Sequence, residues 1–157
     1  REGTVRLTDI LKESSVISDI RGTTKEEILT ELAGQLKAAG LIKDVEPVVR
    51  IIMEREALGS TGIGDGVAIP HGKMKGSGGV LVVFGRSRQG VDFDAVDEQP
   101  VHIFFLVLAP EDSASLHLKV LSRISKILRD PSFRKKLLTL PDAHSLYESI
   151  VEEDGKL

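Results

Sequence analysis

The sequence predicts an α/β fold, a three-layer sandwich in which helices cover both faces of a central sheet. Two segments, residues 80–84 and 101–108, are apolar at nearly every position instead of alternating, as is typical of central strands buried on both faces. Amphipathic helical patterns lie before and after these segments, so helices are available for both sides. With 157 residues, 41% of them hydrophobic, the chain can form one sizeable core. We therefore expect a single domain spanning residues 1–157.

Capping residues mark the expected helix starts. Thr23 and Thr24 each precede a glutamate by three residues, which is a capping-box signature. The apolar residues that follow keep helical spacing up to Gly40, a residue type that favours the position just past a helix end. The other helices are expected to start at Asp44, Ser113, Asp130-Pro131 and Asp142, with the second ending near Arg55 and the last near Val151.

Shorter strands are expected beside the two central ones. Residues 16–20 form a strand candidate before the first helix, and residues 91–93 are expected at an edge of the sheet. The polar residues 94–100 then form a turn. Another apolar stretch ends at Pro70, so a strand is expected just before His71.

The charge balance argues against nucleic acid and membrane surfaces as partners. The chain has 21 basic and 24 acidic residues, so it has no general attraction for phosphate backbones or anionic lipids. The longest apolar run, residues 103–110, is too short to cross a bilayer, which takes about 20 residues. The first residues show no signal-peptide pattern. We expect a cytoplasmic protein without direct membrane insertion.

Metal, thiol and disulfide chemistry are also disfavoured. The chain has no cysteine, which excludes disulfides and thiolate ligands. The four histidines, His71, His102, His117 and His144, are spread along the sequence without an HExxH motif or another ligand spacing. We therefore expect neither a metal ion nor a cofactor.

The most informative segment is the glycine-rich run GSTGIGDGVAIPHGK at residues 59–73. Glycine adopts positive φ without penalty, so the chain can turn sharply in this run. Pro70 fixes the backbone immediately before His71. We expect His71 beyond the carboxyl end of an apolar strand, where open α/β sheets bind ligands.

This run carries no nucleotide-binding motif. A Walker A loop requires a glycine five residues before the Gly72-Lys73 pair, and Val67 stands there. Val67 also occupies the last position of a Rossmann fingerprint that would start at Gly62. A GxSxG nucleophile elbow is absent from the sequence as well, so a serine hydrolase is not expected.

Four residues together suggest a phosphoryl site. His117 lies one turn into a helix, on its apolar side, and Arg55 and Lys73 supply positive charge. A neutral imidazole such as that of His71 is a good nucleophile near pH 7, and a transferred phosphoryl group spreads negative charge over its oxygens. Each residue alone also has an ordinary structural interpretation: a loop histidine, a core histidine or a solvated arginine.

At these positions the sequence resembles the fructose/mannitol-type IIA components of the bacterial phosphoenolpyruvate-dependent sugar phosphotransferase system (PTS). The resemblance covers nearly the whole chain, and it is greatest to the stand-alone nitrogen-regulatory type. The matching segments are RE at 55–56, LGSTGIG at 58–64, AIPHGK at 68–73, FDAVDEQPV at 93–101, APED at 109–112 and HLK at 117–119.

The resemblance implies which four residues form the site. His71 would accept a phosphoryl group from the phosphocarrier HPr, His117 and Arg55 would flank it, and Thr61 lies in the same loop. A mixed sheet with helices on both faces is implied as well. Asp65 departs from the family pattern, since an asparagine is expected there and the aspartate adds a negative charge.

The resemblance leaves more than one function open. The nitrogen-regulatory type is a phosphorylation-dependent switch that binds target proteins, whereas a transport IIA passes the phosphoryl group to a IIB component. The chain carries neither a IIB domain nor a permease, which favours the regulator. A protein-interaction domain that has lost the chemistry is disfavoured, because His71, His117 and Arg55 are all present. The residues expected at the docking surface of the regulator are Ile63, Val67 and Ile69.

Overall fold

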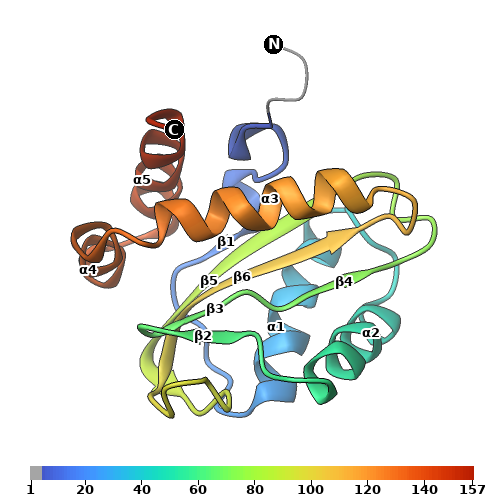
Figure 1. Cartoon of the computed structure of the whole chain (residues 1–157), viewed down its shortest axis with the longest axis horizontal. Coiled ribbons are helices and arrows are strands. Elements are labelled where there is room, and N and C mark those ends of the chain that lie inside the picture. Colours follow the sequence, from blue (N-terminus) through green and yellow to red (C-terminus); the bar gives the residue numbers. More distant parts are fainter. Residues whose placement is uncertain (1–4) are drawn as a thin grey trace.

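The computed structural model describes residues 5–157, and in this range five α-helices surround a six-stranded sheet (Figure 1). The helices are α1 (Lys25–Ala38), α2 (Val45–Ala57), α3 (Ala114–Ile127), α4 (Pro131–Thr139) and α5 (Ala143–Gly155). The strands are β1 (Val16–Ile17), β2 (Gly62–Gly64), β3 (Val67–Ala68), β4 (His71–Lys73), β5 (Leu81–Val91) and β6 (Val101–Ala109). Two 3-10 helices, η1 (Leu7–Asp9) and η2 (Glu13–Ser15), precede β1.

The sheet is mixed, with the order β1-β5-β6-β3-β2 and with β4 also paired to β6. The long strands β5 and β6 are antiparallel, while β1 runs parallel to β5. Both β3 and β4 run parallel to β6 in one register, since Ala68 lies opposite Phe104 and His71 opposite Val107. Residues 67–73 therefore run alongside β6 as one extended segment, in which the strand pairing is interrupted just before His71.

Helices cover both faces of the sheet, as predicted. Helices α1 and α2 lie on one face, and α3 and α5 lie on the other (Figure 1). Successive residues of β6 point to opposite faces, so Phe104 and Leu106 join the core under α1 and α2, while Phe105 and Val107 join the core under α3 and α5. All four side chains are fully buried, and each large apolar side chain buried in this way contributes about 1.5–3 kcal/mol of transfer free energy.

The predicted helix starts are found, although not every predicted cap makes its hydrogen bond. Thr24 accepts from the Glu27 N–H and the Glu27 carboxylate accepts from the Thr24 N–H, which completes a capping box. Asp130 and Asp142 also cap their helices through their carboxylates. Asp44 and Ser113 occupy N-cap positions, but among the described residues neither side chain makes a capping hydrogen bond. The two other N-caps belong to the short 3-10 helices η1 and η2.

Three predicted boundaries were wrong. Residues 91–93 are not a separate edge strand, because Val91 is the last residue of β5 and pairs with Val101 across an irregular stretch of the hairpin. The predicted strand at residues 16–20 is paired only at β1. Helix α5 continues past Val151 to Gly155, because Asp154 near its end is buried and accepts hydrogen bonds from the Leu7 N–H and from Arg123 on α3.

Candidate functional site

Three elements distant in sequence enclose a cavity of about 520 Å³. Helix α2, strand β4 and the first turns of α3 contribute all of its walls. The lining residues are Ile51, Arg55, His71, Gly72, Lys73, Ala114, His117, Leu118 and Leu121. Two imidazoles, a guanidinium and an ammonium thus converge on a space that is otherwise mostly apolar, as ligand sites commonly do.

His71 is the half-buried first residue of β4. Its Nδ1 lies 2.8 Å from the carbonyl oxygen of Ile69, and because a carbonyl can only accept, Nδ1 must carry the proton. In the neutral ring this leaves the lone pair on Nε2. The hydrogen bond therefore fixes both the tautomer and the orientation of the imidazole.

The position of His71 differs from the prediction in one respect. His71 does follow the apolar strand β3, but the chain does not leave the sheet there, because His71 begins β4 and lies opposite Val107 of β6. The carbonyl oxygen of Pro70 accepts from the Val107 N–H at 2.9 Å, but the proline nitrogen has no hydrogen to donate, so the ladder to β6 lacks one donor at this residue. The break between β3 and β4 presents His71 at the side of the sheet.

Gly72 brings α2 against β4. A Cβ atom at Gly72 would lie 2.7 Å from the Cγ2 atom of Ile51, so a larger residue would force the Ile51 side chain or the helix to shift. Arg55 is one turn further along α2 than Ile51 and lines the same cavity as His71. The glycine after the histidine thus allows α2 to pack closely against β4.

His117 is 5% exposed in the first turn of α3, and its ring centroid lies 5.5 Å from that of His71 in an edge-to-face arrangement. Its Nε2 is buried and has no hydrogen-bond partner among the described residues. Burial, helped by the nearby His71 and Lys73, lowers the pKa of His117. The ring is therefore neutral at pH 7, with an unsatisfied polar atom in the ring that faces His71.

Arg55 and Thr61 have different environments. Arg55 lies in the last turn of α2, lines the cavity, and donates from Nη1 to the carbonyl oxygen of Gly59 at 2.8 Å. Thr61 is buried and is not among the described residues that line the cavity. Its hydroxyl and its N–H both donate to the carboxylate of Glu56. The structure thus brings together His71, His117 and Arg55, while Thr61 faces a neighbouring cluster.

Several other positions lie away from the cavity. Asp65 has a left-handed backbone (φ 57°) at the turn between β2 and β3, where its carboxylate is 4.0 Å from Arg134 of α4. Val67 and Ile69, predicted at a docking surface, are instead core residues, and only Ile63 of the three is exposed. These strand residues are buried because α3 and α5 cover that face of the sheet.

The remaining histidines make local contacts. His102 lies 2.8 Å from the carbonyl oxygen of Ser87, and His144 contacts Glu13 and Glu148. Within residues 5–157 no group of three or more metal-ligating side chains gathers. In the same range, none of the helices has the length and apolar character needed to span a bilayer.

Sequence reasoning missed the Glu56 cluster beneath the glycine-rich loop. Glu56 is buried and forms an ion pair with Lys25 of α1 at 3.0 Å. Its neighbour Arg55 could be predicted as a site residue because a cation suits a phosphoryl site. The sequence does contain an indication of this cluster: Glu56 is an acidic residue at an inward position of α2, and a buried carboxylate needs a partner.

The chain is similar to known proteins over nearly its whole length. Residues 9–153 match the family described as phosphoenolpyruvate-dependent sugar phosphotransferase system, EIIA 2. A nitrogen regulatory protein of Bradyrhizobium diazoefficiens is 39% identical over 142 residues, covering 90% of this chain and 92% of the relative. The fructose-specific EIIABC component of Bacillus subtilis is 34% identical over 150 residues, covering 96% of this chain but only 24% of that protein.

A solved structure is similar over nearly the whole fold. The crystal structure of the nitrogen regulatory protein IIA-Ntr from Neisseria meningitidis superposes with a TM-score of 0.85 at 33% identity, covering 92% of this chain and 98% of that one. The mixed sheet with helices on both faces is therefore shared with a IIA protein. The chain belongs to the EIIA 2 family of the phosphoenolpyruvate-dependent sugar phosphotransferase system.

Proposed function

We propose that this PTS protein carries its phosphoryl group on Nε2 of His71, having accepted it from an HPr-type phosphocarrier. The observation that carries the proposal is the hydrogen bond from Nδ1 to Ile69, which leaves Nε2 as the nucleophilic nitrogen. His71 lines the cavity together with His117 and Arg55. His71 thus combines a fixed tautomer with two cations that line the same cavity, Arg55 and Lys73.

The transfer needs no external acid or base. The lone pair of His71 Nε2 attacks phosphorus, a new N–P bond forms, and the N–P bond to the donor imidazole breaks with its electron pair returning to the donor nitrogen. The proton on Nδ1 stays in its hydrogen bond to Ile69 throughout. Catalysis then depends on positioning and on stabilising the charge of the transferred group.

Three neighbours stabilise that charge. Arg55 and Lys73 line the cavity as fixed cations, and a guanidinium can hold two phosphoryl oxygens at once. The buried, unpartnered Nε2 of His117 is available to donate a hydrogen bond when the ring adopts the Nε2–H tautomer. Such groups are effective because they are already in place when the negative charge arrives.

We favour a regulatory role of the nitrogen-regulatory type over sugar transport. The similarity to nitrogen regulatory proteins extends over 92% of one relative and 98% of one solved chain. Phosphorylation would change partner binding through charge, because a phosphoryl group adds a charge of about −1.5 to −2 at pH 7 by analogy with phosphorylated hydroxyls. Leu118 lies at the cavity and is 68% exposed, so a partner docked there would have to bury the added charge, which is costly without a cation opposite.

A transport role is the second candidate, because the fructose-specific relative is 34% identical. In that role a IIB component would take the phosphoryl group from His71. Pull-downs from a host lysate with wild type, His71→Ala and the phosphomimetic His71→Asp separate the two. We expect the unphosphorylated forms to retain a target that His71→Asp releases. Identical partner sets for all three, together with transfer to a sugar-specific IIB, would favour transport.

Labelling tests the carrier function itself. Phosphoenolpyruvate labelled with ³²P, enzyme I and HPr should label wild type in an acid-labile form and leave His71→Ala unlabelled. His144→Ala is the matched control, because His144 is exposed and lies on α5, outside the cavity. Label on His71→Ala, or label that maps to His102 or His144, would overturn the assignment.

A further inference from the structure

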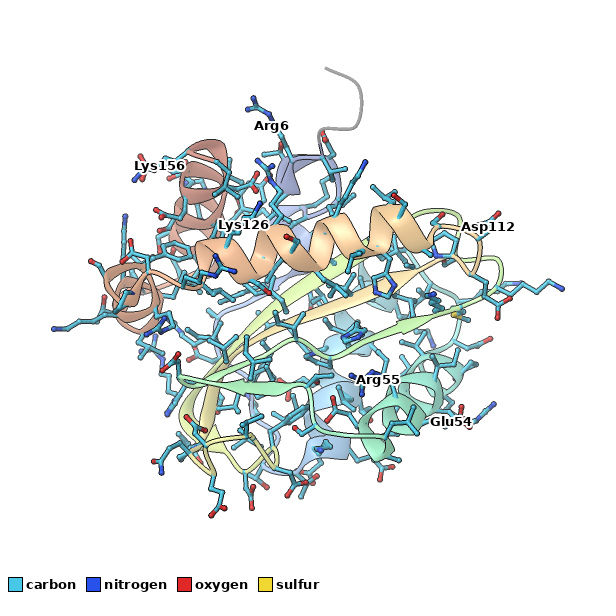
Figure 2. All side chains as sticks on the ribbon, in the orientation of Figure 1. Arg6, Glu54, Arg55, Asp112, Lys126 and Lys156 are labelled. Carbon is cyan, nitrogen blue, oxygen red and sulfur yellow. The ribbon has the colours of Figure 1, made fainter. Side chains whose placement is uncertain are left out.

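Glu56 stands next to Arg55 in α2, but its side chain points into the protein instead of into the cavity. Neighbouring helical residues point about 100° apart, so one side chain of the pair lines the cavity while the other is buried. The Glu56 side chain is 2% exposed. Figure 2 shows Arg55 extending from α2 toward the strands, on the side where the cavity lies.

The buried carboxylate has a complete set of partners. It accepts from the Thr61 N–H at 3.1 Å and from the Thr61 hydroxyl, and it pairs with Lys25 Nζ at 3.0 Å. Lys25 has two further contacts, since its Nζ lies 3.3 Å from the Asp94 carboxylate and 4.7 Å from the centroid of the Phe93 ring. A buried ion pair with this many contacts has one preferred geometry, because each broken contact leaves a charge or a dipole unpaired.

The cluster fixes the turn that begins the glycine-rich run. Glu56 holds this turn at Thr61, and the Ser60 hydroxyl holds it by donating to the Phe93 carbonyl oxygen at 2.7 Å. Gly59 belongs to the same turn, and its carbonyl oxygen accepts from Arg55 Nη1 at 2.8 Å. The place of the guanidinium is therefore set by a carbonyl whose own place is set by Glu56.

We propose that Glu56 is a positioning residue for phosphoryl transfer: through Thr61 and the Gly59 carbonyl it aims the Arg55 guanidinium at the His71 cavity. Lys25 neutralises the carboxylate so that its charge does not oppose the incoming phosphoryl group. Thr61 then transmits the effect of Glu56 to Arg55 and does not itself touch the phosphoryl group. The inference rests on the proposed function, because it gives Arg55 a role in transfer.

A merely structural Glu56 would predict a different pattern of rates. If Glu56 acts by aiming Arg55, its loss should matter only while Arg55 is present, which a double-mutant cycle measures. The test variants are Glu56→Gln, which keeps the shape and removes the charge, and Thr61→Val, which removes only the hydroxyl. Glu54→Gln is the matched control, since Glu54 is an exposed acid on the same helix.

The first readout is the rate of transfer from phospho-HPr. We expect Glu56→Gln to slow transfer about 10- to 100-fold, on the scale of a misplaced catalytic group, while Glu54→Gln leaves it within about 2-fold. In the Arg55→Ala background, adding Glu56→Gln should change the rate by less than about 2-fold. Equal slowing in both backgrounds would overturn the proposal. If Glu56→Gln fails to fold, the cycle is run with Thr61→Val, and the same two outcomes decide.

The second readout needs no phosphoryl donor. The ¹⁵N relaxation of Arg55 Nε reports the order of the guanidinium, and we expect that order to fall in Glu56→Gln and Thr61→Val but not in Glu54→Gln. Unchanged order in both test variants would contradict the proposal. A wild-type protein that takes no label from phospho-HPr would instead overturn the proposed function, while the relaxation experiment would still decide the role of Glu56.

Discussion

At the scale of single residues, two histidines of the same cavity differ in how their rings are hydrogen-bonded. His71 has a fixed Nδ1–H and a free Nε2, whereas His117 is buried with an unpartnered Nε2. The segments IPH and HLK and the residue Arg55 could be identified from the sequence, because each places a nucleophile or a cation in a recognisable local pattern. The environment of Thr61 could not, because it depends on a carboxylate that only the packing of α1 against α2 buries.

His117 and Arg55 should assist transfer without accepting the phosphoryl group. Loss of one preorganised charge-stabilising group commonly costs about 10²-fold in rate or more. We therefore expect His117→Ala and Arg55→Ala to fold but to transfer about 10²-fold more slowly, as measured by quench-flow with phospho-HPr. His102→Ala, which alters a histidine outside the cavity, should transfer normally. Unchanged rates in both test variants would reduce His117 and Arg55 to structural residues.

The lowered pKa of His117 makes a contribution to the free energy of unfolding that depends on pH. Because burial depresses the folded-state pKa below the ordinary value of 6.5, the unfolded state binds the proton first as the pH falls. This contribution is therefore present above pH 6.5 and is lost on acidification toward the folded-state pKa. Urea unfolding of wild type and His117→Gln between pH 8 and pH 5 should show a smaller acid loss in the variant.

His144 acts in the opposite direction and serves as the control. Its hydrogen bond to Glu13 raises its pKa above the ordinary 6.5, so its contribution is present in acid and lost as the pH rises. His144→Gln should therefore lose more stability in acid than wild type does. An equal acid loss in wild type and His117→Gln would mean that His117 titrates alike in both states.

At the scale of elements, a buried arginine connects β5 to the end of α4. Arg86 is fully buried and donates to the carbonyl oxygens of Ser18, Leu137 and Leu140. Each buried acceptor left without a donor costs about 1–3 kcal/mol. Arg86→Met should therefore lower the free energy of unfolding by about 3–5 kcal/mol.

Urea denaturation of Arg86→Met measures this effect, with Arg88→Met as the matched control. Arg88 pairs with Asp19 at 2.6 Å, but both side chains are about half exposed, and exposed ion pairs contribute roughly 0–1 kcal/mol. If the two variants lost equal stability, the carbonyl contacts of Arg86 would carry no net free energy.

The elements themselves differ in how well the sequence predicted them. Helix starts were found because a capping box such as that of Thr24 and Glu27 is local in sequence. The strands β2 and β4 were not predicted, because each has three residues with few apolar side chains and exists through its pairing with a neighbouring strand. Residues 91–93 were mistaken for an edge strand because nothing local shows that Val91 continues β5 across a bulge.

At the scale of the whole molecule, the site lies at one side of the sheet, where α2 and α3 from opposite layers flank β4 (Figure 1). This arrangement explains why Arg55, His71 and His117 are far apart in sequence yet share one cavity. The two continuous apolar strands were enough to predict the layers, because strands buried on both faces require helices on both. The cavity could not be predicted in the same way, because no pattern of hydrophobicity reveals the close approach of Ile51 to Gly72.

The most direct test of the central claim is ¹⁵N and ³¹P NMR of the protein after transfer from phospho-HPr, with its histidine rings labelled with ¹⁵N. The geometry predicts a phosphorus–nitrogen coupling at Nε2 of His71, with Nδ1 still protonated by virtue of its hydrogen bond to Ile69. Phosphorylation at Nδ1 of His71, or at either nitrogen of His117, would contradict this assignment.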